Sequence, residues 1–200
     1  GIDIQLGGEQ EERADALGGL AIGSLLSLIL IYSLLAIPLK SYVQPLIIMS
    51  VIPFGAVGAI AGHYVLDQQL VFFSALGLTA LSGVVVNASL VLVDYANKRK
   101  LEGKTPIEAI LGAASIRFRP IILTSVTTFV GLIPLMSTST PATAPFLPMV
   151  ISLAWGVLFA TVITLMLVPC LYIIIHDFVR EADSSEGEIG GLIEEPQSAG

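Results

Sequence analysis

Charge is what this 200-residue sequence has least of. Only 12% of its residues are Asp, Glu, Lys or Arg, while 54% are hydrophobic. Soluble domains carry roughly 25% charged residues, so this composition disfavours a large soluble domain and indicates a membrane protein. The net charge of −7 is concentrated near the ends, because ten of the 16 acidic residues fall within residues 9–15 and 181–195.

Cysteine, histidine and catalytic motifs are equally scarce. The single cysteine, Cys170, excludes an intrachain disulfide and is expected to be a small buried apolar residue. His63 and His176 lie at opposite ends of different apolar runs, and neither belongs to an HExxH motif or a phosphate-binding loop. We therefore expect no enzyme activity, no metal and no cofactor. The nine basic residues form no patch interleaved with aromatics, so nucleic acid is not an expected partner.

What the sequence has in abundance is uncharged runs. One helix needs roughly 20 residues to cross the hydrocarbon core, so the first three runs fit one span each. The fourth run is too long for a single span, and the Ser-, Thr- and Pro-rich segment STSTPATAPFLP divides it. The sequence thus predicts an all-α integral membrane protein with a five-helix transmembrane bundle. The expected spans are residues 17–38, 43–65, 70–95, 120–137 and 147–175.

Polar segments flank this bundle, which is expected to occupy residues 16–176. Residues 1–15 are acidic and resemble the end of a water-exposed domain. Residues 177–200 have the acidic, Gly- and Ser-containing composition of a disordered tail. The sequence begins with Gly1 and shows no signal peptide, which suggests a fragment of a longer protein.

Basic residues predict how the bundle is oriented. Five spans put the connections alternately on two sides, and positively charged connections face the cytoplasm. One side holds Arg13 alone, whereas the other holds eight basic residues. The N-terminal end is therefore expected in the periplasm and the C-terminal end in the cytoplasm. The eight are Lys40, Lys98, Arg99, Lys100, Lys104, Arg117, Arg119 and Arg180.

Two local patterns add detail to this bundle. Thr105 and Glu108 have capping-box spacing, which predicts an amphipathic helix over 105–118 on the cytoplasmic face. This helix either lies at the lipid headgroups or packs on the bundle, and the two are compatible. Gly55, Gly58 and Gly62 have the spacing that lets membrane helices approach closely, so they are predicted helix-packing residues.

Polar residues at membrane depth are the candidate functional residues, because they are costly there. Asn87 and Asp94 lie seven residues apart and share a helix face. Asn87 alternatively makes an ordinary interhelical hydrogen bond, and Asp94 alternatively pairs with Lys98 at the membrane surface.

The fourth span adds a second group of candidates. Thr124 and Thr128 share a face, which Arg117 joins if the helix continues through Pro120. The threonines alternatively donate to carbonyls of their own helix.

Longer motifs carry a family resemblance. They are GEQEERADAL, QPLIIMSVIPFGAVGAI, GVVVNASLVLVDYANKRK, EAILGAASIRFRPIILTSVTTFVGLIPL and LFATVITLMLVPCLY. Together they resemble the C-terminal membrane portion of the permeases of resistance–nodulation–division (RND) efflux pumps, over about residues 7–176. The resemblance implies the last five of twelve spans.

That resemblance also implies a function. Such permeases export drugs or other amphiphiles in exchange for protons, from the bacterial inner membrane. The implied partners are the rest of the same chain, two further copies in a homotrimer, a periplasmic adaptor, an outer-membrane channel and membrane lipids. Among the candidates, Arg117 and Thr124 match the proton-coupling Arg and Thr of the family.

One position departs from the family pattern. Val86 stands where the family keeps a lysine, directly before Asn87, so the usual lysine–carboxylate pairing is not available to this chain. A different function within the superfamily remains open: a non-pumping module for lipid or sterol sensing or for protein export.

Overall fold

Helices account for the fold of this chain. The computed structural model describes residues 8–137, 140–141 and 143–193, and no strand occurs in these ranges. Side chains are described for residue 12 and for residues 14–178 within the same ranges. The helices are α1 (Gly8–Leu39), α2 (Gln44–Met49), α3 (Ile52–Val65), α4 (Phe72–Leu101), α5 (Pro106–Ser137) and α6 (Leu147–Ile193), with a 3-10 turn η1 (Ala144–Phe146) before α6.

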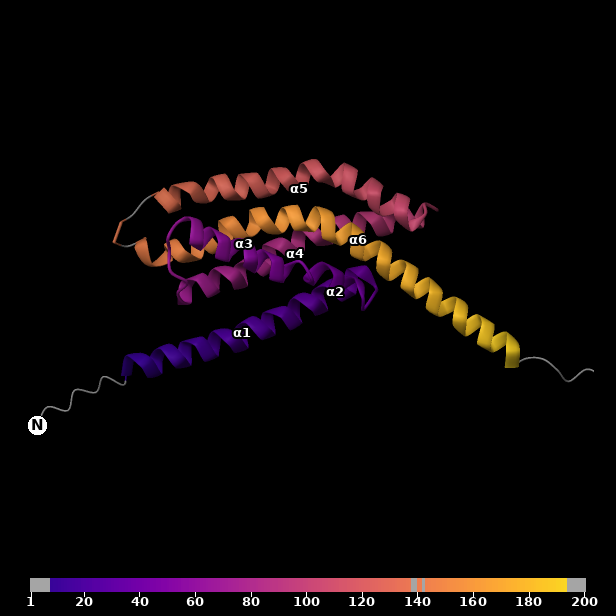
Figure 1. Cartoon of the computed structure of the whole chain (residues 1–200), viewed down its shortest axis with the longest axis horizontal. Coiled ribbons are helices and arrows are strands. Elements are labelled where there is room, and N and C mark those ends of the chain that lie inside the picture. The colour runs from indigo at the N-terminus through magenta and orange to yellow at the C-terminus, as the bar shows by residue number, and fades with distance from the viewer. Residues whose placement is uncertain (1–7, 138–139, 142, 194–200) are drawn as a thin grey trace, which may run out of the picture.

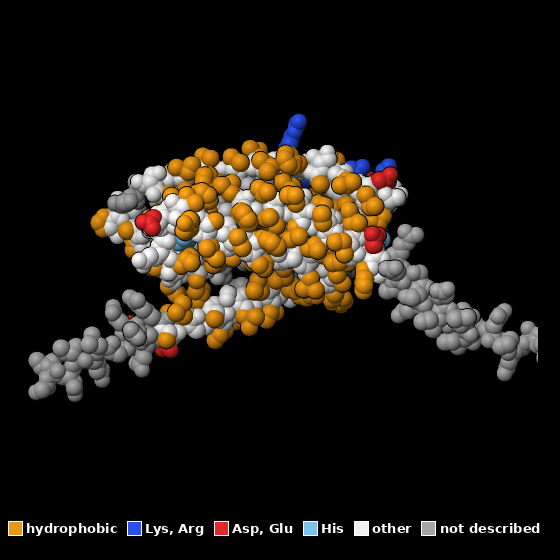
Figure 2. Space-filling model, viewed as in Figure 1, with side chains coloured by type: hydrophobic (Ala, Val, Ile, Leu, Met, Phe, Trp, Pro, Cys, Tyr) orange, Lys and Arg blue, Asp and Glu red, His pale blue; other side chains and the backbone are white. Residues whose placement is uncertain are grey.

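The predicted five-span bundle is confirmed. Five helical stretches are long and apolar enough to cross a membrane: Ala14–Leu39, Gln44–Val65, Phe72–Leu101, Pro106–Ser137 and Ala144–Phe178. They run side by side along the long axis, with α5 and α1 on opposite outer sides (Figure 1). The surface between the two ends is broadly hydrophobic, and acidic and most basic side chains gather near the ends (Figure 2). This distribution suits a lipid-facing surface.

The second span is divided rather than continuous. Helix α2 ends at Met49, and α3 begins at Ile52 with Pro53 in its first turn. Backbone N–H groups in the first turn of a helix have no acceptor within that helix, so a proline there removes no helical hydrogen bond. Its fixed φ angle also suits the first turn. Pro53 thus stands where a new helix starts.

Helix α5 joins two predicted segments. The capping box is confirmed: Glu108 N donates to Thr105 Oγ1 at 3.3 Å, and Thr105 N donates to Glu108 Oε2 at 3.2 Å. The helix that begins here does not end at residue 118 but continues through Pro120 to Ser137. The segment 105–118 is therefore the first part of a membrane-length helix and not a separate one.

Both flanks extend the bundle helices. Residues 8–15 belong to α1, and residues 1–7 lie outside the described residues. The tail from 177 was expected to be disordered, yet α6 continues to Ile193; residues 194–200 lie outside the described residues. Extending an existing helix avoids the cost of nucleation, which an isolated tail would have to meet. Cys170 is exposed on α6 rather than buried, since it faces away from the packed helices.

Helix α6 is the centre of the packing. It contacts α3, α4 and α5, whereas α1 contacts α2 and α4 and is largely exposed. The core between these helices is aliphatic, with Ile48, Leu92, Val93 and Ile110 fully buried. The position of α6 matters for function, because it brings polar residues of three helices together.

The three predicted packing glycines all face neighbouring helices. A Cβ at Gly58 would clash with Phe159 Cβ, and a Cβ at Gly62 would clash with Trp155 Cγ. A Cβ at Gly55 would lie 3.0 Å from Leu81 Cδ2. Helix α3 can therefore lie this close to α6 only where it carries no side chain.

We expect Gly58→Ala and Gly62→Ala each to lower the free energy of unfolding by about 1–3 kcal/mol, because the added methyl overpacks the α3–α6 contact. Thermal unfolding of the chain in detergent measures this. Gly19→Ala and Gly23→Ala are matched controls, since nothing lies within 4 Å of a Cβ at either position. Equal stability of all four variants would contradict the proposed packing role.

Candidate functional site

A half-open cavity with a mixed polar and apolar lining lies between α4, α5 and α6. Its volume is about 300 Å³, which is room for about ten water molecules. Among the described residues, none that lines it carries an ionisable side chain. Its polar lining consists of one amide and five hydroxyl side chains: Asn87, Thr124, Ser125, Thr128, Thr161 and Thr164.

Two of the predicted site residues meet in this cavity. Asn87 reaches it from α4 and Thr124 from α5. The side chain of Asn87 is exposed and has no hydrogen-bond partner within the described part of the chain, so the interhelical hydrogen bond considered as an alternative is not present there. Thr124 Oγ1 donates to its own helix at Ile121 O, 2.9 Å away. Thr128, on the same face, likewise donates to Thr124 O at 2.8 Å.

The two charged candidates lie elsewhere. Asp94 Oδ2 is 2.7 Å from Lys98 Nζ one helical turn away, so the surface ion pair considered from the sequence is formed. Arg117 places its Cζ 4.8 Å from the ring centroid of Tyr95, a cation–π contact between α5 and α4. The Nε of Arg117 is buried and has no hydrogen-bond partner among the described residues.

Neighbouring positions on α4 face different surroundings. The side chain of Val86 is only 6% exposed and packs in the aliphatic core, whereas Asn87 lines the cavity. A lysine at position 86 would have to extend out of this core. Of the α4 residues that line the cavity, Asn87 is the one with a polar side chain.

Residues of α6 complete the site, and the sequence interpretation missed them. The hydroxyl oxygens of Ser125 and Thr161 lie 2.6 Å apart across the α5–α6 contact. Thr161 also donates to Val157 O at 2.7 Å. Thr164 Oγ1 is buried in the same cavity without a partner among the described residues. Hydroxyls three residues apart in an otherwise apolar span were the available signal.

A second polar cluster was also missed and lies near Lys98. Asn97 Nδ2 donates to Gln44 Oε1 at 2.7 Å, and Gln44 Nε2 donates to Asn97 Oδ1 at 3.2 Å. The hydroxyl of Tyr172 donates to the same Asn97 oxygen at 2.9 Å. This cluster ties α2, α4 and α6 together at one end of the bundle.

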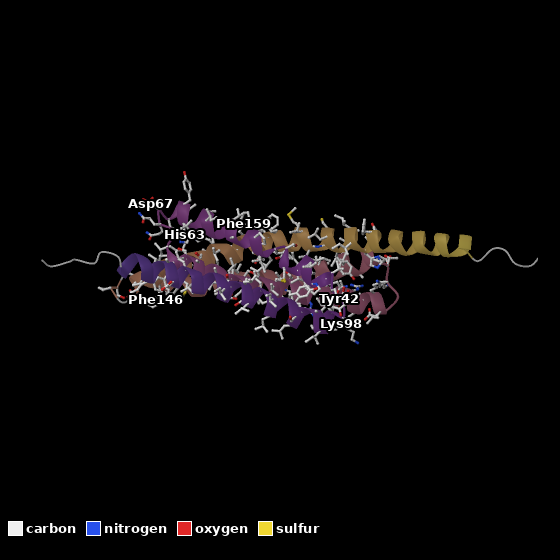
Figure 3. All side chains as sticks on the ribbon, turned by 90° about the horizontal axis from the view of Figure 1, so that it is seen from below. Tyr42, His63, Asp67, Lys98, Phe146 and Phe159 are labelled. Atoms are coloured by element: carbon white, nitrogen blue, oxygen red, sulfur yellow. The ribbon has the colours of Figure 1, made fainter. Side chains whose placement is uncertain are left out.

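The opposite end is held by a buried histidine. His63 Nδ1 donates to Ala59 O at 3.0 Å, and Nε2 lies 2.9 Å from Ser74 Oγ. Because Ala59 O can only accept, Nδ1 carries the proton and Nε2 accepts from Ser74. His63, Asp67 and Phe146 lie at one end of the bundle, and Tyr42 and Lys98 lie at the other (Figure 3).

A polar cavity within membrane-length helices is typical of the membrane domain of a transporter. The chain belongs to the AcrB/AcrD/AcrF family, whose sequence profile matches residues 1–176. The resemblance to RND efflux permeases is thereby confirmed, and the chain is part of a multi-pass membrane protein of that family.

Relatives and solved structures agree with this assignment. The chain is 29% identical to the swarming motility protein SwrC of Bacillus subtilis (strain 168), over 94% of this chain and 18% of SwrC. It is 32% identical to the multidrug resistance protein MdtC of Proteus mirabilis (strain HI4320), over 78% of this chain and 15% of MdtC. The crystal structure of a heavy metal efflux pump matches 84% of this chain and 16% of the pump, with TM-score 0.73 and 27% identity. The chain thus spans less than a fifth of these proteins.

We expect Asn97→Ala to lower the free energy of unfolding by about 1–3 kcal/mol, because Gln44 and Tyr172 lose their partner in a half-buried site. Asp94→Asn is the control: it removes an exposed ion pair of one helical turn, worth about 0.3–0.5 kcal/mol. Denaturation in detergent compares the two variants. A cost for Asn97→Ala no larger than for Asp94→Asn would contradict a stabilising cluster.

Proposed function

We propose that this chain is the C-terminal membrane portion of a proton-driven RND permease that exports drugs or other amphiphiles. The observation that carries the proposal is the uncharged polar cavity between α4, α5 and α6, within a chain of this family. The similarity to MdtC, a multidrug resistance protein, supports the substrate class. The site residues proposed for coupling are Asn87 and Thr124, with Arg117 beside the cavity helices.

Coupling in this proposal depends on a carboxylate outside this chain, supplied by the rest of the permease. While that carboxylate is charged, the amide of Asn87 donates hydrogen bonds to it, and Thr124 can donate by giving up its bond to Ile121 O. Protonation removes the charge, so the hydrogen bonds to the carboxyl group become weaker and another packing of the helices becomes favourable. The proton can shift the equilibrium between the two helix packings only because it binds one packing more tightly than the other.

Arg117 has a longer-range role in this mechanism. Its guanidinium stays charged in proteins and is held against Tyr95 at the α4–α5 contact. Its Nε lacks a partner within the described residues, so a group of the remaining permease can accept from it. Asp94 is engaged by Lys98 and is the weaker coupling candidate.

The proposal extends to the assembly and its location. The permease acts as a homotrimer in the bacterial inner membrane, with a periplasmic adaptor, an outer-membrane channel and surrounding lipids. The residues before α1 are periplasmic, and the C-terminal end of α6 is cytoplasmic. The support is the family, together with the grouping of basic residues in connections that share one end.

Removing the polar groups of the cavity tests the coupling role. In the permease that contains this chain, we expect Thr124→Val and Asn87→Leu each to reduce efflux and proton uptake at least about tenfold, because each removes hydrogen bonding to a buried charge. Dye efflux and proton uptake in proteoliposomes, at equal protein content, measure this. Thr127→Val is the control, since Thr127 is exposed on α5 and outside the cavity. Unchanged transport in both variants would reject the proposed roles.

Orientation has its own test. In a Cys170→Ser background, we expect Gln68→Cys to react with a membrane-impermeant maleimide from the periplasm, and Lys104→Cys only after the inner membrane is opened. Both positions are exposed and lie in opposite connections. The reverse labelling pattern would show that the bundle is inverted.

A further inference from the structure

Most hydroxyls around the cavity use their single proton in a hydrogen bond within the protein. Thr124, Ser125, Thr128 and Thr161 each place the hydroxyl within 2.7–3.0 Å of a backbone carbonyl of their own helix. The hydroxyl oxygens of Ser125 and Thr161 also lie 2.6 Å apart, so one of these two hydroxyls gives its proton to the other instead of to a carbonyl. A hydroxyl has one proton and two lone pairs, so a hydroxyl that donates to its own helix offers lone pairs to the cavity. The cavity lining is therefore rich in acceptors and poor in free donors.

Thr164 supplies an independent observation. Its side chain is 1% exposed and lines the cavity, yet its Oγ1 has no hydrogen-bond partner in the described part of the chain. A buried hydroxyl without a partner is costly, so such a group in a cavity indicates that a water, an ion or a group from the rest of the permease completes its hydrogen bonding. Thr161 lies one turn away on α6 and faces the same space.

The charge of the cavity specifies that species further. Hard cations bind to neutral and anionic oxygen atoms, and water completes their coordination. The described residues of this chain offer five hydroxyl oxygens and the amide oxygen of Asn87 to the lining, and none of them is a Lys, Arg or His that would repel a cation. The volume of about 300 Å³ admits an ion together with several waters.

We infer that this cavity binds a partly hydrated monovalent metal cation, with Na⁺ as its representative, through Thr161, Thr164, Ser125 and Asn87. The ion supplies a positive charge in a cavity to which this chain brings none of its own. The inference deepens the proposed coupling function, and its transport arm rests on that function. Within the coupling cycle, the cation stabilises the charged form of the carboxylate and leaves when that group is protonated.

Binding of ²²Na⁺ to the purified full-length permease tests the site directly. We expect saturable binding that unlabelled Na⁺ displaces and choline does not. Thr164→Val should weaken binding about tenfold or more, because it removes a ligand of a charged species. Asn87→Asp should tighten binding, because it adds a carboxylate to a position that is exposed and tolerates it. Misfolding would weaken binding in both variants, so weaker binding in Thr164→Val together with tighter binding in Asn87→Asp cannot result from it.

Thr127→Val is again the matched control, and its binding should equal that of the unaltered permease. Absence of saturable ²²Na⁺ binding, or binding that neither Thr164→Val nor Asn87→Asp changes, would overturn the inference.

Transport in proteoliposomes under an imposed pH gradient separates this inference from the proposed function. Slower efflux in choline than in Na⁺ medium supports the bound cation. Equal efflux in the two media, together with no Na⁺ binding, overturns the cation site and leaves proton-driven efflux standing. Intact Na⁺ binding without efflux in either medium supports the site and rejects the proposed function.

Discussion

The close approach of α3 to α6 is the contact on which the rest of the bundle depends. Without water in the hydrocarbon, helices gain little from burying apolar surface and associate through tight packing. Gly58 and Gly62 allow that packing because the space of their missing side chains is filled by Phe159 and Trp155. Once α6 is held there, it meets α4 and α5 along the face that carries Thr161 and Thr164.

The polar groups of the bundle follow from the same environment. A hydroxyl in an apolar span must find an acceptor, and the nearest is a carbonyl one turn back in its own helix. Most of the cavity hydroxyls meet this need locally, for example Thr161 with Val157 O. Their lone pairs then set the character of the cavity, and Thr164 is the exception that points to a ligand. The need of these hydroxyls to donate to their own helix thus leaves oxygen lone pairs facing the cavity.

The ends of the bundle are fixed by different chemistry from its middle. At one end, Asn97 joins Gln44 and Tyr172 by neutral hydrogen bonds. At the other end, His63 and Ser74 close the α3–α4 turn. The middle holds the cavity and has no comparable interhelical network apart from the Ser125–Thr161 contact among the described residues. Side-chain hydrogen bonds hold the helices together at both ends, and few interhelical hydrogen bonds join them around the cavity. This arrangement suits a bundle whose helices repack during transport.

The sequence by itself determined the five spans, the capping box at Thr105 and the family, because hydropathy, cap spacing and long motifs are local properties. It also identified Asn87 and Thr124, since polar residues in apolar runs are visible without a structure. Only the tertiary structure decided which of them meet. Helical spacing places residues on a face but does not say which helix that face contacts. For this reason the α6 hydroxyls were missed, Asp94 proved to pair with Lys98, and Val86 was found in the core.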